Sequence, residues 1–187
     1  MSTTTVVVLV AIVVAVAAAV AVILKNRRSQ RLRSRFGPEY TRAFEESGSK
    51  NQAEAKLEKL EKRVQRYNLT PLSAPARAEF MAEWQGIQSR FVDDPKGALV
   101  EADTLIQKMM TARGYPVNDF EQRAADISVD HPLVVENYRA GHEIALRLAQ
   151  GRASTEDMRQ GMIEYRTLFN DLAGEPEMAR VATSARA

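Results

Sequence analysis

A single uninterrupted apolar stretch near the N-terminus constrains this chain more than any other feature. Residues 6–24 read VVVLVAIVVAVAAAVAVIL, nineteen positions without a charged or polar side chain, Gly or Pro. A helix of that length is roughly 28 Å long, close to the roughly 30 Å of a bilayer hydrocarbon core. In lipid the backbone must pair its own polar groups, so a lone span is helical despite its Val content. The sequence predicts a transmembrane helix over residues 6–24, preceded by a short tail, residues 1–5.

A basic juxtamembrane segment, residues 25–38, follows the apolar stretch. No acid precedes Glu39. Short Lys/Arg-rich flanks stay on the cytoplasmic side of a membrane. The segment therefore predicts a single-pass protein of the bacterial inner membrane, with the N-terminus outside and everything after Leu24 inside. The lipid bilayer and its anionic headgroups are the expected partners of its six cations, which are Lys25, Arg27, Arg28, Arg31, Arg33 and Arg35.

A cleaved signal peptide is the alternative interpretation of this N-terminus. The triplets at residues 17–19 and 19–21 resemble small-residue cleavage sites, but the residues before the apolar stretch carry no side-chain charge. We therefore expect an uncleaved anchor, with an exported helical domain as the alternative. Ala11, Ala15 and Ala19 also repeat every four residues, a spacing that lets membrane helices pair closely. The chain is thus a candidate homo-oligomer, although a stretch this rich in Ala contains such spacings by composition alone.

The charge of the remaining chain differs from that of the basic segment. Removing the six cations of that segment from the 26 basic residues leaves 20, against 24 acidic residues, a formal net charge of −4. A folded module that binds nucleic acid needs a basic face, so no nucleic-acid partner is expected. The chain has no cysteine, which excludes disulfides, thiol nucleophiles and thiolate metal sites.

Residues 39–173 have the 3.6-residue apolar period of helices and no strand-like alternation. We expect an all-α fold, with a cytoplasmic helical bundle of about six helices after the transmembrane helix. Ser73, Asp94, Asn118 or Asp119, and Ser154 are placed as N-caps, and Gly114 as a left-handed helix end. The tail, residues 174–187, has no apolar stripe and is predicted to be disordered. The expected helices cover about 38–46, 49–67, 73–91, 94–113, 118–127, 132–150 and 154–173.

Several of these helices carry apolar stripes that predict their buried faces. The stripe on helix 49–67 has the a/d spacing of a coiled coil but covers only about two heptads, which favours packing within the domain. Gly141 and Gly161 lie inside predicted helices, where each costs roughly 1 kcal/mol relative to Ala. Close helix contacts would explain both glycines. The stripes are Ala53, Leu57, Leu60, Val64 and Tyr67; Phe80, Trp84, Ile87 and Phe91; and Val135, Tyr138, His142, Ala145 and Leu148.

One polar cluster has the residue types of a metal or acid–base site. Its members are Asp126, Asp130, His131, His142 and Glu143. Their spacing is poor for that chemistry, because adjacent helical residues such as His142 and Glu143 point about 100° apart. Asp130 is explained as a helix cap near Pro132, and Glu143 as part of a charge ladder with Arg139 and Arg147. We therefore predict no catalytic residue, metal ligand or cofactor.

Four segments between Arg31 and Phe169 are distinctive. They are RLRSRFGPEY (31–40), FVDDP (91–95), ARGYPVNDFEQRAADISVDHPLVVENYRAGHEIA (112–145) and ASTEDMRQGMIEYRTLF (153–169). In these segments the chain resembles a family of bacterial proteins described only as membrane or secreted proteins. The resemblance implies no activity, cofactor or site residue.

Together these features predict a membrane-anchored helical interaction or scaffold module that binds a protein partner. The alternative is a membrane-tethered ligand-binding sensor or enzyme that uses the Asp126–Glu143 region.

Overall fold

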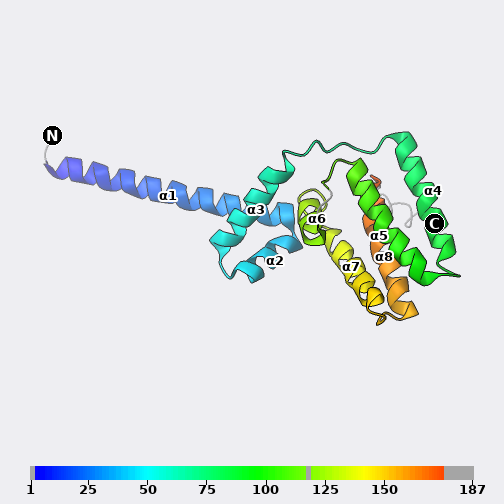
Figure 1. The fold of residues 1–187 in the computed structure, drawn as a ribbon. Coiled ribbons are helices and arrows are strands. Elements are labelled where there is room, and N and C mark those ends of the chain that lie inside the picture. The colour runs from blue at the N-terminus through cyan, green and yellow to red at the C-terminus, as the bar shows by residue number, and fades with distance from the viewer. Residues whose placement is uncertain (1–2, 117–118, 175–187) are drawn as a thin grey trace, which may run out of the picture. The chain divides into compact units, whose positions relative to one another are not determined.

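The computed structural model describes residues 3–116 and 119–174, with side chains from residue 11 onward. Within these ranges the chain forms eight helices and no strand, which confirms the all-α prediction (Figure 1). Seven helices follow α1, one for each of the seven expected ranges and one more than the expected bundle of about six. The chain divides into two compact units, Met1–Glu58 and Lys59–Ala187, and the boundary falls inside α3. The predicted disordered tail lies outside the described residues, apart from Gly174.

The first unit contains α1 (Thr3–Phe36), α2 (Pro38–Ser47) and the first part of α3 (Lys50–Val64). Gly37, with a φ of 48°, turns the chain between α1 and α2, and Pro38 suits the first turn of the new helix. The helix α1 thus continues without a break through the basic segment, which was predicted to be distinct from the apolar helix. The core of this unit consists of Leu32, Phe36, Tyr40, Ala43, Ala53 and Leu57, all buried.

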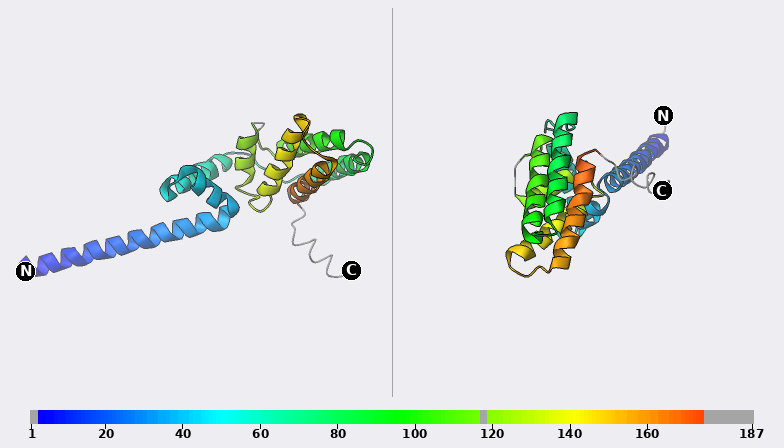
Figure 2. Two further views of the ribbon diagram at one scale, coloured as in Figure 1. Left: turned by 90° about the horizontal axis from the view of Figure 1, so that it is seen from below. Right: turned by 90° about the vertical axis from the view of Figure 1, so that its right-hand side faces the viewer.

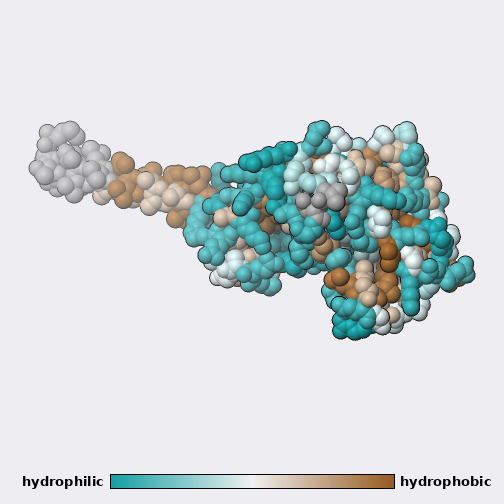
Figure 3. All heavy atoms as spheres, viewed as in Figure 1, coloured by the Kyte–Doolittle hydropathy of each residue, from teal (hydrophilic) through white to brown (hydrophobic). Residues whose placement is uncertain are grey.

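The apolar half of α1 is exposed along its described length. Its large aliphatic side chains from Ile12 to Leu24 are 48% to 65% accessible, and Figure 3 shows this stretch as a rod of apolar residues. Within residues 3–116 and 119–174, no helix combines the length and the apolar character that a membrane crossing requires. The predicted transmembrane helix over residues 6–24 is thus not supported by the described residues, and the side chains of residues 6–10 lie outside them.

The second unit contains the end of α3 and five further helices, whose starts are set by local signals. Each of the four caps accepts a backbone N–H three residues on, as the sequence predicts. Ser154 and Asp157 also form the expected capping box. Gly114 has a φ of 97°, the left-handed conformation predicted for it. The helices are α4 (Ala74–Arg90), α5 (Pro95–Ala112), α6 (Phe120–Ile127), α7 (Val135–Ala149) and α8 (Thr155–Leu172), and the caps are Ser73, Asp94, Asp119 and Ser154.

The helix α5 lies at the centre of this unit, next to α4, α7 and α8 (Figures 1 and 2). It contributes seven buried residues, Ala98, Leu99, Ala102, Leu105, Ile106, Met109 and Met110. The aromatic stripe of α4 faces the core, as predicted. Trp84 stacks on Phe169 of α8 with ring centroids 4.9 Å apart. An aromatic pair of this kind adds about 0.5–1.5 kcal/mol to the burial of its surface.

Two glycines explain how closely α7 and α8 pack. A Cβ at Gly141 would lie 2.9 Å from the Tyr165 ring, and one at Gly161 would lie 2.8 Å from Leu99. Both distances are too short for a side chain, so the structure confirms the close contacts. The buried face of α7 is consequently Val135, Tyr138, Gly141 and Ile144. The predicted stripe through His142, Ala145 and Leu148 is therefore wrong after Tyr138, since those three side chains are only half-buried.

Candidate functional site

Asp126 is a structural carboxylate in the second unit. It is 1% exposed, and Arg63 donates to its Oδ1 over 2.5 and 3.0 Å. Gln122 donates to the same oxygen over 2.9 Å, and the Tyr67 hydroxyl donates to Oδ2 over 3.0 Å. Burial raises the pKa of Asp126 above its usual range, although Tyr67 and Arg63 oppose that shift. These contacts tie α6 to the end of α3 and leave Asp126 apart from His131 and His142.

His142 and Glu143 do not form a site with the other members of the predicted cluster. The His142 ring stacks on Phe120 with centroids 3.6 Å apart, and its buried Nδ1 has no hydrogen-bond partner. Burial lowers the pKa of His142, because a charged ring would lose its hydration there. Glu143 is exposed.

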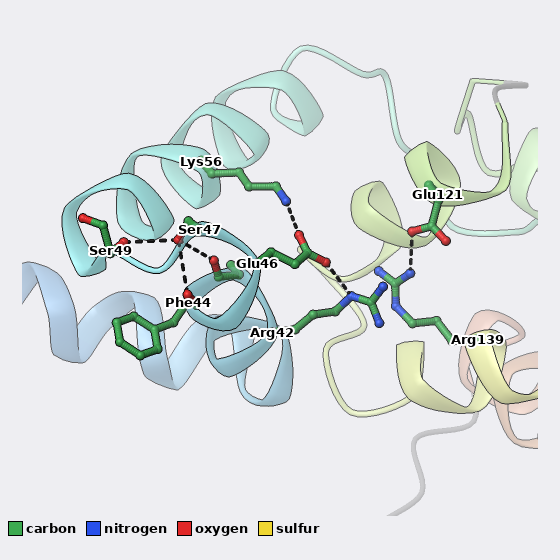
Figure 4. A network of polar contacts seen from close by, with 9 residues as sticks. Arg42, Phe44, Glu46, Ser47, Ser49, Lys56, Glu121 and Arg139 are labelled. Carbon is green, nitrogen blue, oxygen red and sulfur yellow. Dashed lines mark hydrogen bonds and ion pairs between the residues drawn. The ribbon is translucent and has the colours of Figure 1, made fainter.

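The two arginines of the predicted charge ladder on α7 contact other helices. Arg139 pairs with Glu121 over 2.9 Å, as Figure 4 shows, and Arg147 pairs with Asp157 over 3.0 Å. Glu121 lies on α6 and Asp157 on α8, so these pairs connect helices rather than neighbouring turns of α7. The i,i+4 explanation of Glu143 stays a prediction.

Asp130 is not a helix cap, because α7 begins at Val135 and its N-cap residue is Val134. The Asp130 carboxylate is exposed and lies 3.5 Å from the Tyr115 hydroxyl. His131, a member of the predicted cluster, lines a pocket. No group of three or more His, Cys, Asp or Glu side chains within the described ranges is arranged to hold a metal ion.

The His131 pocket has a volume of about 380 Å³. The Nδ1 atom of His131 hydrogen-bonds to Asp171. The Nη1 atom of Arg113 lies 3.2 Å from the Nε2 atom of His131 and 3.1 Å from the carbonyl oxygen of Leu172. Arginine can only donate, so Nε2 accepts and Nδ1–H donates to Asp171. Two guanidinium groups suit a carboxylate or phosphate ligand. The pocket is lined by Pro71, Leu72, Arg77, Arg113, His131, Asp171, Leu172, Ala173 and Gly174.

The cations predicted for the membrane surface lie in two environments. Lys25 and Arg27 are exposed on α1. Arg28 forms a two-bond pair with Glu58, over 2.6 and 2.9 Å, and Arg33 lies 5.1 Å from the centroid of the Tyr40 ring. Arg31 and Arg35 also interact with other groups. Part of the basic segment therefore holds the first unit together.

A buried carboxylate joins the three helices of the first unit. Glu54 is 1% exposed and accepts hydrogen bonds from Ser29 over 2.6 Å and from Tyr40 over 3.0 Å. Burial acts to raise the pKa of Glu54, but these hydroxyls, with Lys50 and Arg28, outweigh burial and hold the pKa below its usual range. This network fixes Tyr40 beside Arg33.

A second pocket, here called the basic pocket, lies in the first unit and has a volume of about 650 Å³. Two cations, two aromatic rings and one hydroxyl line it, and no acid does. The Phe44 ring is 45% exposed, and it points away from the side of α2 on which Glu46 pairs with Arg42 and Lys56 (Figure 4). The lining residues are Arg33, Gly37, Tyr40, Thr41, Phe44 and Lys50.

Comparison of the chain with protein-family models, with curated proteins and with solved structures finds no match.

The basic segment and His131 could be identified from the sequence, but the residues that line a pocket with each of them could not. Tyr40 and Lys50 in the basic pocket, and Arg77 and Asp171 in the His131 pocket, come from other helices. A local pattern contains no signal for such long-range pairings.

Proposed function

We propose that this chain is a membrane-anchored helical module whose folded part binds a protein partner at the inner face of a bacterial membrane. The exposure of the apolar half of α1 carries the proposal. Eight Val, Ile and Leu side chains between residues 12 and 24 are 48% to 65% accessible. Each contributes roughly 1.5–3 kcal/mol when it leaves water, so this surface favours insertion into lipid.

The continuity of α1 supports the same proposal. A single helix runs from Thr3 to Phe36, and its second half packs on α2 through Leu32 and Phe36. An anchor of this kind would hold the first unit next to the bilayer without an intervening linker. The six cations of the basic segment favour the cytoplasmic orientation.

Binding rather than catalysis is proposed for the folded part because its polar residues hold helices together. Asp126, His131 and Arg147, the kind of residues an active site would use, make contacts between elements of the second unit.

A second candidate function is ligand sensing. The observation that favours it is the His131 pocket, whose volume of about 380 Å³ falls within the usual range for small-ligand sites.

Membrane extraction of the full chain tests the anchor. We expect the protein to stay with bacterial membranes in alkaline carbonate, and V13R/V20R to release it, because each Arg at mid-membrane costs about 2.5–3.5 kcal/mol. V92R/V100R, at two exposed positions of the second unit, adds the same charge and should leave the protein in the membrane. Release of the unaltered chain by carbonate would contradict the anchor. An active alkaline phosphatase fused to the C-terminus would contradict the orientation.

A further inference from the structure

The basic pocket has the chemistry of a site for a phosphate group attached to an apolar body. Arg33 and Lys50 supply two positive charges, and Tyr40 and Phe44 supply aromatic walls. The carboxylate of Glu54 is 3.9 Å from the Lys50 ammonium. Even with Glu54 counted, the pocket keeps a net charge of +1, so it favours an anion.

The position of the pocket along α1 indicates where that anion comes from. Arg33 follows Leu24 by nine residues, which is about 14 Å along a helix. The polar headgroup layer is roughly 5–8 Å deep on each side of the hydrocarbon core. Helical side chains lean toward the N-terminus, which brings the long Arg33 side chain nearer to the headgroups.

We propose that the basic pocket binds the phosphate-bearing headgroup of an anionic membrane phospholipid. Arg33 and Lys50 contact the phosphate, while Tyr40 and Phe44 pack against the glycerol and the first part of the acyl chains. The inference rests on the proposed membrane anchor for its choice of lipid over a soluble phosphate ester. A pocket of this kind gives the first unit a preference for particular headgroups. The general attraction of basic residues to a membrane does not provide such a preference.

Native mass spectrometry of the full chain in dodecylmaltoside tests this site directly. The probes are dihexanoyl phosphatidylglycerol, which is anionic, and dihexanoyl phosphatidylcholine, which is zwitterionic. We expect the anionic lipid to be retained and the zwitterionic lipid to be lost. Because each hydrogen bond to a charged group contributes about a tenfold factor or more, R33Q/K50Q should reduce retention by more than tenfold. T41W should also reduce retention, because it adds a bulky ring to the pocket wall without a change of charge.

The matched control is R27Q/K59Q, which removes one exposed Arg from α1 and one exposed Lys from α3. This variant should retain the anionic lipid. Equal loss in R27Q/K59Q, or full retention in T41W, would overturn the proposal. So would displacement by sn-glycerol 3-phosphate at equal concentration, which would identify a soluble phosphate ester as the occupant. The assay needs no bilayer, so a chain that is released by carbonate but still retains the anionic lipid refutes the anchor alone.

Discussion

Gly141→Ala should destabilise the protein even though alanine is the better helix former. The substitution favours the helix by about 1 kcal/mol. The new Cβ would, however, lie 2.9 Å from one carbon of the Tyr165 ring and 3.1 Å from two others. That ring is fully buried, and its hydroxyl donates to Asp103 over 2.8 Å. Burial raises the pKa of Tyr165, so the hydroxyl stays a donor and the ring stays fixed.

Overpacking of a fixed core group costs typically about 1–3 kcal/mol, and helix separation around Gly141 would loosen further contacts between α7 and α8. We therefore expect a net loss of about 1 kcal/mol in the free energy of unfolding. For a chain of this size the loss corresponds to a decrease of roughly 2–4 °C in the midpoint of thermal unfolding. Thermal and guanidinium unfolding of the full chain in mild detergent, followed by circular dichroism, measures both quantities.

Gly86→Ala is the matched control, because Gly86 lies inside α4 and a Cβ there would meet only Arg90, at an ordinary 3.5 Å. Here the gain in helix propensity is not opposed, so we expect stabilisation by about 0.5–1 kcal/mol. Opposite signs for the two substitutions would show that the contact with Tyr165 decides the result. If Gly141→Ala stabilised the protein as much as Gly86→Ala, the close packing of α7 on α8 would be refuted.

The remaining predictions concern two histidines. Burial lowers the pKa of His142 below the usual 6.5, so below that pH the unfolded chain binds a proton that the folded chain excludes. The free energy of unfolding should therefore fall as the pH decreases from about 7 to 5, and His142→Gln should flatten that dependence; an unchanged slope would contradict the role of His142. For the His131 pocket, citrate should raise the midpoint of thermal unfolding in the unaltered chain but not in Arg77→Gln. A bound ligand at about 100 times its Kd adds about 2.7 kcal/mol to the free energy of unfolding. An equal shift in both proteins would exclude this pocket as the site.

The features that the sequence predicts best are those that neighbouring residues determine. Ser73, Asp94 and Ser154 cap their helices because each side chain accepts a hydrogen bond from a backbone N–H only three residues on. The buried residues Trp84 and Ile87 of α4 follow from the spacing of its predicted aromatic stripe. Such signals need no information about the rest of the fold.

The features that it predicts poorly depend on distant contacts. The buried face of α7 departs from the predicted stripe at Gly141. There the Tyr165 ring packs directly on the helix because Gly141 has no side chain. Glu54 and Asp126 are charged residues that a sequence would place in solvent. They are buried because partners 25 and 63 residues away, Ser29 and Arg63, satisfy them.

Because α1 is one continuous helix, the directions of the side chains in its apolar half are fixed relative to those in its basic half. Eighteen residues make five turns of a helix, so Ala11 and Ala18 lie on the same side of α1 as Ser29 and Phe36, which are buried in the first unit. The valines on the other side point away from α2. If two copies pair through the side of α1 that carries Ala11 and Ala18, α1 also turns their α2 helices toward the shared axis. A single residue inserted near Lys25 would rotate that arrangement by about 100°.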